Sequence, residues 1–329
     1  MINISFKSVL ELINAYNSED ICIRQLEDLR WEGNPVSPFD ETSIVYKCSN
    51  NKYKCKNTGK YFNVKTGTLF DSTKIPLQKW FLAIFLITEH KRGISSVQLA
   101  RDLGVTQKTS WHMLQRIREC FGQDDDMLSG EVQVDETFVG GKNKNRHADK
   151  KVANSQGRSF KDKTPVVGLL EPKEEESNVR LHKVIPNRYI TEKKITKPAK
   201  LYCEVVGSTS AKEIQPIIRN KVCADTILVT DEWCAYHGLG ADFNHKFVDH
   251  GRKNYQTEDG YSSNGVENAW SHLKRTLHGT YIHVTRKHLF RYVNEFVFRF
   301  NNMGKKMHER FYFFFANMEN RLTYKQLVK

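Results

Sequence analysis

Residues 131–141 read EVQVDETFVGG, a stretch in which apolar and polar side chains alternate before a pair of glycines. Alternation with a period of two is typical of a β-strand with one buried face. Asp135 follows the alternating run, so we expect its carboxylate to project from the carboxyl end of that strand. A second stretch, TILVTDEW at 226–233, has the same form, with an apolar run that leads to Asp231. The two stretches therefore predict two strands that each end in an aspartate.

A third acidic residue, Glu267, lies near the start of NGVENAWSHLKR (264–275), a segment with helical character. Mg²⁺ prefers carboxylate oxygens together with water and phosphate. Two such ions about 4 Å apart activate an oxygen nucleophile and stabilise the leaving oxygen of a phosphodiester. One acid alone is more often a surface or capping residue. The set of three predicts a two-metal site in which Asp135 bridges both ions and Glu267 completes the second, with Asp231 on an adjacent strand.

Lys274 lies seven residues after Glu267, close to two helical turns, so the two side chains share a helix face. A cation there holds a phosphate near the metal ions without removing the charge of a carboxylate. Arg275 and His272 extend this basic edge. The alternative is an amphipathic helix whose solvent face happens to carry lysine and arginine. We expect Lys274 to act in catalysis and, together with Arg275, to contact DNA.

The bulk composition favours a polyanionic partner. The chain has 329 residues, a formal net charge of +13 and a pI of about 9.3. A large positive charge is typical of nucleic-acid-binding proteins, although a simply basic protein is the alternative. The seven cysteines are odd in number and scattered, which predicts a reducing, cytoplasmic environment without a disulfide framework. The first residues lack the pattern of a signal peptide, and the longest apolar run, 80–87, is too short to span a bilayer, so we expect no membrane association.

The order of the predicted elements indicates a mixed α/β organisation. Strand-like runs occur at 131–139, 164–171, 178–184, 199–206 and 226–230, and helical patterns at 209–221 and from Thr285 onward. Strands that cluster first, with helices later, are typical of a mixed sheet with flanking helices. We expect N-terminal helices at 1–30, a small β-ribbon module at 31–70, a helix-turn-helix region at 71–122, a catalytic domain at 131–310 and a C-terminal tail at 311–329.

The helix-turn-helix prediction depends on capping residues. Ser95 or Ser96 can cap a first helix, Gly104 breaks it, and Thr106 can cap the second. Two helices joined by a turn with glycine are the DNA-binding pattern, although an ordinary αα-hairpin is the alternative. Gln107 and Lys108, at the start of the second helix, are candidate DNA contacts.

A basic loop separates the first two strands of the predicted catalytic domain. Residues 142–163 carry eight Lys or Arg against two Asp. Such a segment is typical of a mobile loop that faces phosphates, or of a solvated insertion. The candidate DNA contacts in it are Lys142, Lys144, Arg158 and Lys161.

Four segments, taken in order, resemble the ISXO-type insertion-sequence DDE transposases. They are VDETFVGGK, the loop that ends QGRSFKDKTPVVGLLE, the run ILVTDEWCAY, and the long segment that begins VENAWSHLKRTLHGTY. The resemblance covers about 60–310. It implies a ribonuclease-H-like (retroviral-integrase-like) catalytic fold, Mg²⁺ or Mn²⁺ as cofactor, and action on terminal inverted repeats of double-stranded DNA as a homo-oligomer. Asp135, Asp231 and Glu267 match the DDE acids, and Lys274 the lysine that extends them.

The resemblance also implies two steps: water first frees a 3′-hydroxyl, which then attacks target DNA at the same site. Two departures stand beside it. The N-terminal zinc ribbon of the family would have its first ligand pair at 34–37, which contains no cysteine, and its second at Cys55 and Thr58. Cys55 and Cys48 cannot complete a four-ligand zinc site, so we expect no zinc and a ribbon held by aromatic residues. Those residues are Tyr46, Tyr53, Tyr61 and Phe62.

The second departure lies just before Glu267, where a histidine is common in the family and this chain reads Tyr-Ser-Ser-Asn at 261–264. Three other functions fit parts of the sequence. The chain can be a helix-turn-helix DNA-binding protein with an inactive remainder, a ribonuclease-H-like nuclease that hydrolyses without joining, or a zinc-ribbon interaction protein. The three intact acids argue against the first of these, and the missing zinc ligands argue against the last.

Overall fold

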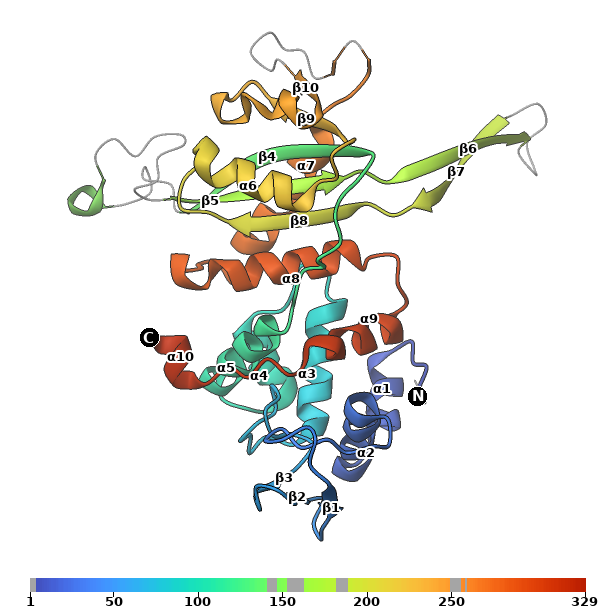
Figure 1. Cartoon of the computed structure of the whole chain (residues 1–329), viewed down its shortest axis with the longest axis vertical. Coiled ribbons are helices and arrows are strands. Elements are labelled where there is room, and N and C mark those ends of the chain that lie inside the picture. The colour runs from blue at the N-terminus through green and yellow to red at the C-terminus, as the bar shows by residue number, and fades with distance from the viewer. Residues whose placement is uncertain (1–3, 141–146, 153–162, 182–188, 249–255, 258) are drawn as a thin grey trace. The chain divides into compact units, whose positions relative to one another are not determined.

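The computed structural model describes residues 4–140, 147–152, 163–181, 189–248, 256–257 and 259–329 (Figure 1). The chain divides into two compact units: unit 1 contains Met1–Gly122 and Lys305–Lys329, and unit 2 contains Gln123–Gly304. The segment after 304, expected to end the catalytic domain and form a tail, therefore belongs with the N-terminal residues.

A five-stranded mixed sheet forms the centre of unit 2, in the order β10-β9-β4-β5-β8. Its strands are β4 (Glu131–Gly140), β5 (Lys163–Glu171), β8 (Lys200–Val205), β9 (Ile227–Asp231) and β10 (Asn244–Val248). β5 pairs antiparallel with both β4 and β8, whereas β9 pairs parallel with both β4 and β10. The expected mixed α/β class with flanking helices is confirmed.

Two strands outside this sheet differ from the expectation. The strand expected at 178–184 begins earlier, as β6 (Glu174–Leu181), and among the described strands its one partner is β7 (Tyr189–Lys197). The two form a separate antiparallel ribbon (Figure 1). Neither β7 nor β10 was predicted, because β7 is rich in Lys, Thr and Glu and lacks a buried face, while β10 is mostly polar and buries only Val248.

Helices cover both faces of the sheet of unit 2. On one face, α6 (Ala211–Lys221) packs over Val132 and Val134 of β4. On the other face lie α7 (Asn264–Thr276) and α8 (Leu289–Asn301), whose apolar residues pack against β5 and β8 (Figure 1). Short helical turns occur at Ala148–Lys150, Cys234–Tyr236, Leu239–Ala241, Leu277–Tyr281 and Arg286–His288. Because side chains alternate along β4, Gln133 and Asp135 face α7.

Unit 1 is mainly helical and has an aromatic core. Its helices are α1 (Val9–Ala15), α2 (Glu19–Trp31), α3 (Leu77–Glu89), α4 (Ser96–Leu103), α5 (Gln107–Glu119), α9 (Met307–Phe314) and α10 (Tyr324–Val328), with a 3-10 turn at Phe315–Asn317. Phe81 lies 5.6 Å from Phe311 and 5.4 Å from Phe315 between ring centroids. Phe6 contacts Phe311 at 5.3 Å. The C-terminal aromatic run is therefore part of this core.

The capping residues predicted for the helix-turn-helix are confirmed. The Ser95 hydroxyl accepts a hydrogen bond from the amide of Gln98 and thereby caps α4. Gly104 ends α4 with φ of 59°, in the left-handed region that glycine adopts without strain. Thr106 caps α5 by accepting from the amide of Thr109.

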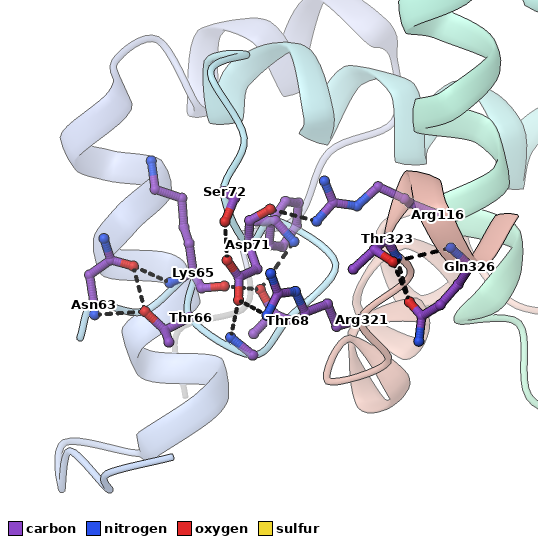
Figure 2. Close-up of polar contacts among 12 residues, drawn as sticks. Asn63, Lys65, Thr66, Thr68, Asp71, Ser72, Arg116, Arg321, Thr323 and Gln326 are labelled. Carbon is purple, nitrogen blue, oxygen red and sulfur yellow. Dashed lines mark hydrogen bonds and ion pairs between the residues drawn. The ribbon is translucent and has the colours of Figure 1, made fainter. Parts of the chain in front are cut away.

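Asp71 joins three segments of unit 1 (Figure 2). Its carboxylate accepts from the amide of Gly67 at 2.9 Å and pairs with Arg321 at 3.3 Å. Its backbone oxygen accepts from the buried Arg116 of α5 at 2.8 Å. Arg116 also stacks on Trp80 of α3. This network connects the segment after the ribbon, the second helix of the helix-turn-helix and the chain before α10.

The small β-ribbon contains β1 (Val45–Lys47), β2 (Tyr53–Cys55) and β3 (Tyr61–Phe62). Its core holds Tyr53 and Phe62, as expected, but Tyr46 and Tyr61 point to solvent because they lie on the other face of the pleat. Trp31 of α2 takes their place, 5.0 Å from Tyr53.

Hydroxyl groups surround the thiol of Cys55, which is buried in this ribbon. Burial raises the pKa of the thiol, but hydrogen bonds with Ser37, Ser43 and Thr58 outweigh that effect and lower the pKa to about 6. Ser37 and Thr58 come from the two stretches where zinc ligands would stand in a zinc ribbon. Polar side chains therefore meet at the place that a zinc ion would occupy.

Candidate active site

Asp135 lies in the middle of β4, not at its carboxyl end as the sequence suggested. The strand continues for five residues beyond it, because residues up to Gly140 keep pairing with β5 as far as Lys163. Asp135 itself pairs with Gly168. The strand run predicted at 131–139 agrees with β4, so the error lay only in the position of Asp135 within it: the point where the alternation stops is not the point where the strand ends.

Asp231 is the last residue of β9, as predicted, on the strand adjacent to β4. The parallel register pairs Gln133 with Val229. Two residues further along each strand, Asp135 and Asp231 therefore lie level with one another. The Asp231 carboxylate accepts a hydrogen bond from the amide of Trp233 at 3.0 Å, which orients it. The register of two neighbouring strands thus brings together two acids that are 96 positions apart in the sequence.

A residue that the sequence interpretation missed, Glu136, joins these two acids. One carboxylate oxygen from each of Asp135, Glu136 and Asp231 lies within 4.8 Å of the others. Alternation alone places Glu136 on the opposite face from Asp135, where Tyr236 is buried; burial, together with the charge of Glu136, raises the pKa of that tyrosine. The sequence did offer one signal, which is that two acids, Asp135 and Glu136, are adjacent. Only the register of β4 against β9 shows that both approach Asp231.

Glu267 reaches the site from the first turn of α7, as predicted. Its carboxylate accepts from the hydroxyl of Ser263 at 3.3 Å, within the stretch where the family commonly has a histidine. Gln133 of β4 accepts from the amide of Val266 at 3.2 Å and so attaches the start of α7 to the sheet. Gly265 permits this close approach, because a Cβ there would stand 2.8 Å from Leu170 and would overlap the Gln133 amide.

The electrostatics of the site call for a cation. Burial, together with the charges of Asp231 and Glu267, raises the pKa of Asp135 to about 6, against the lowering effect of hydrogen bonds from the Glu136 amide and Trp270. Glu267 therefore acts on Asp135 electrostatically, although it stands outside the close group of three oxygens. Hard carboxylate oxygens in this number are the donor set that suits Mg²⁺ or Mn²⁺. Asp135, Asp231 and Glu136 would hold an ion from the sheet, and Glu267 from the helix.

We expect Asp135→Asn to stabilise the metal-free protein. Ionisation of the Asp135 carboxyl lowers the free energy of unfolding, because its pKa is about 6 in the folded protein and 3.8 ordinarily. The folded state therefore binds the proton more tightly than the unfolded state, and stability falls as pH rises from about 4 to 6. The variant should gain about 2 kcal/mol at pH 7.5 and little at pH 4.5.

Urea denaturation of both proteins in EDTA at the two pH values measures this difference. Added Mg²⁺ should then stabilise the wild type more than the variant. An equal stability of the two proteins at pH 7.5 would contradict the burial of the charge.

Trp270 positions the Asp135 carboxylate. Its indole N–H donates to Asp135 Oδ2 at 3.0 Å, and its ring lies over Gly168. Trp270→Phe keeps most of the ring and removes the donor, so the fold should persist while the carboxylate loses its orientation. We expect the dissociation constant for Mg²⁺ to rise about tenfold. A calorimetric titration with Mg²⁺, beside a melting curve, separates this from a general loss of structure.

The other predicted site residues divide into three groups. Lys274 and Arg275 are exposed in the last turn of α7. Seven residues of helix rise about 10 Å, so Lys274 shares a helix face with Glu267 but lies about two turns away from it. Gln107 and Lys108 are exposed at the start of α5, where Gln107 donates to the Ser96 hydroxyl and Lys108 lies over the Tyr324 ring of α10. The loop candidates Lys142, Lys144, Arg158 and Lys161 lie outside the described residues.

The model of the ISXO2-like transposase domain matches residues 127–301, more than half of the chain. The chain belongs to the ISXO2-like transposase family. The match spans the sheet from β4 to α8 and includes all of the acids described above. The protein is therefore a transposase-family protein of the insertion-sequence type, as the sequence resemblance indicated.

Two curated relatives support this family. The first is an uncharacterized protein in transposable element ISH50 of Halobacterium salinarum, 26% identical over 260 residues that cover 75% of this chain and 79% of the relative. The second is an uncharacterized transposase-like protein of Haemophilus influenzae, 34% identical over 104 residues that cover 31% of this chain and 82% of the relative.

A solved structure, the pre-cleavage Mos1 transpososome, aligns with 95% of this chain and 97% of its own at 12% identity, with a TM-score of 0.17. A score that low does not establish a shared fold. Within the part of the chain that the structure describes, no helix has the length and apolar character needed to cross a bilayer.

Proposed function

We propose that this transposase is a DDE enzyme that cleaves phosphodiesters at the ends of an insertion sequence and joins the freed 3′-hydroxyl to target DNA. The observation that carries the proposal is the meeting of Asp135, Glu136 and Asp231 at one point of the sheet, with Glu267 coupled to them from α7. When bound, two divalent ions supply an activated oxygen nucleophile and relieve charge on the leaving oxygen.

The residues of this chain would hold and orient the reacting groups. Asp135 and Asp231 would bind the metal ions from neighbouring strands, and Glu267 would add a ligand from the helix. Trp270 keeps the Asp135 carboxylate in place, while Lys274 would hold a phosphate that follows the scissile one. The same carboxylates serve hydrolysis and joining, because both reactions displace an oxygen at phosphorus.

The strand order supports a ribonuclease-H-like fold for unit 2. β4, β5 and β8 follow one another as an antiparallel meander, and the chain then crosses by α6 to β9 on the other side of β4. This arrangement places the central first strand and the returning parallel strand side by side, which is where both aspartates stand. We propose that the fold and the site belong to the ribonuclease-H-like class on that basis.

Double-stranded DNA is the proposed substrate, and a homo-oligomer of this protein is proposed to bind it. The net charge of +13 supports a polyanion as partner. The basic residues of the loop at 142–161, Lys274 and Arg275 in unit 2, and Gln107 and Lys108 in the helix-turn-helix are the proposed DNA contacts.

Incubation with the end DNA of the element and Mg²⁺ tests the function. A transposase yields a free 3′-hydroxyl at the terminal repeat and, with added target plasmid, a joined product. A nuclease without joining activity yields only the first product, and a DNA-binding protein yields neither. DNA affinity should also fall steeply with salt, since each neutralised phosphate releases counterions.

We expect Lys274→Ala to lower the cleavage rate about tenfold and DNA affinity much less, because a phosphate held beside the metal ions is stabilised most during the reaction. Single-turnover cleavage at saturating protein, beside an equilibrium binding curve, measures the two effects separately. Unchanged cleavage kinetics would refute a role for Lys274 near the scissile phosphate.

A further inference from the structure

A cavity of about 460 Å³ opens directly beside Asp231 in unit 2. Its walls come from the turn that follows β9 and from the edge strand β10. The side chains that matter for its chemistry are Asp231, Trp233, Tyr236, His237, His245 and Phe247. Of these, only Asp231 is a proposed metal ligand, and the ring faces and imidazoles of the others have no assigned role, so the cavity is an unassigned feature next to the reacting centre.

Aromatic rings line this cavity and one of them is kept open to solvent. Phe247 on β10 is 66% exposed, an unusual position for a large apolar side chain on a sheet edge. The His245 ring lies beside it, 6.5 Å away between centroids. Trp233 is held by a hydrogen bond from its indole N–H to the backbone oxygen of Thr209 at 3.2 Å. The cavity thus offers ring faces, at least one of which is fixed in orientation.

The polar groups of the cavity suit an uncharged ligand better than a second phosphate. His245 Nε2 lies 2.9 Å from the hydroxyl of Thr230, and burial, together with nearby His237, lowers the pKa of His245. The Asp231 and Glu232 carboxylates at the rim repel an anion. Neutral imidazole nitrogens and ring faces together are complementary to a planar heterocycle that has hydrogen-bonding edges.

We propose that this cavity binds one unpaired nucleobase next to the scissile phosphodiester, stacked against Phe247. The placement rests on the proposed function, because Asp231 then belongs both to the cavity and to the metal site that holds the reacting phosphate. A base on a nucleotide next to that phosphate would then lie beside the cavity. Aromatic faces bind unpaired bases of any sequence by stacking, and an enzyme that acts on DNA can turn a base out of the duplex.

Binding of single-stranded oligomers tests the cavity without any cleavage. The probes are a fluorescent 12-residue oligothymidylate and a 12-residue oligomer of abasic sites with the same number of phosphates, both in EDTA with the full chain. We expect the wild type to bind the thymidylate about tenfold more tightly than the abasic oligomer. Phe247→Ala should bring that ratio close to one by weakening thymidylate binding only, and Phe247→Trp should restore it.

Phe290→Ala is the matched control, because Phe290 is also an exposed phenylalanine of unit 2 but lies on α8. It should keep the wild-type ratio. A ratio near one in the wild type, or a ratio that Phe247→Ala leaves unchanged, overturns the proposal. Loss of affinity for both oligomers equally in Phe247→Ala also overturns it, since stacking would then not be the cause.

A second measurement identifies which DNA supplies the base. 2-Aminopurine is placed on either side of the scissile phosphate in duplex end DNA, or in the target duplex, with Ca²⁺ present. At one of these positions, the fluorescence should rise when the wild-type protein turns the base out of the duplex. It should not rise with Phe247→Ala. No rise at any position overturns the proposal. The oligomer assay needs no metal. Base binding in the cavity can therefore be found even if cleavage and joining are absent, and cleavage and joining can be found even if base binding is absent.

Discussion

Asp231→Asn is expected to reduce cleavage of end DNA by about a thousandfold or more while DNA binding persists. The substitution keeps the shape of the side chain and the hydrogen bond from the Trp233 amide, but removes a negative charge from a cluster that would bind the metal ions. Asp135→Ala and Glu267→Ala should have the same outcome, because each would remove a metal ligand. The measurement is single-turnover cleavage in Mg²⁺ beside a binding assay in Ca²⁺.

Asp242→Asn is the matched control for this result. Asp242 is also in unit 2, but it is exposed and pairs with Arg219 at the surface at 2.8 Å. Exposed ion pairs contribute little to stability, so this variant should cleave like the wild type. Wild-type cleavage by Asp231→Asn would remove Asp231 from the metal site and would leave the DDE assignment without support.

The second large effect is expected from Gly168→Ala, which should destabilise unit 2 by about 3 kcal/mol. Gly168 pairs with Asp135 on one side and with Cys203 on the other. A Cβ at this position would overlap Cη2 and Cζ2 of Trp270 and would stand 3.5 Å from the Cys203 sulfur. The buried indole can move only by giving up its hydrogen bond to Asp135, so cleavage should fall as well.

Urea denaturation measures the loss of stability, and two further variants define its cause. Gly279→Ala adds the same methyl group in unit 2 where no atom stands within 4 Å, so it should be nearly neutral. Trp270→Leu combined with Gly168→Ala removes the overlap and should recover part of the stability but not the cleavage. A Gly168→Ala protein as stable as the wild type would show that the indole does not need this space.

Local patterns in the sequence were sufficient for many of the elements. Apolar alternation identified the strands that contain Asp135 and Asp231, and the capping residues Ser95 and Thr106 located two helix starts, because a cap depends only on residues three positions away. The position of Glu267 in the first turn of a helix followed from the same local periodicity. The prediction for the core of the ribbon was only partly right. Tyr46 and Tyr61 are aromatic, as core residues often are, but they point outward.

The choice between the faces of such short strands depends on what packs against them, and here Trp31 of α2 does so. The same limit applied to β7 and β10, whose few or charged residues show no periodicity of their own. They are strands because of their pairing, β7 with β6 and β10 with β9, which a pattern within each segment does not show.

The sequence by itself thus predicted three acidic residues as metal ligands and the kind of element that carries each of them. Only the tertiary structure decided that Asp135 stands in mid-strand and that Glu136 lies close to it. It also decided that Trp270 lies over Gly168, from where its indole N–H holds the Asp135 carboxylate. The physical reason is that side-chain periodicity is a property of a few neighbouring residues. Strand register and the closeness of a helix to a sheet are set by contacts between segments that lie about a hundred residues apart.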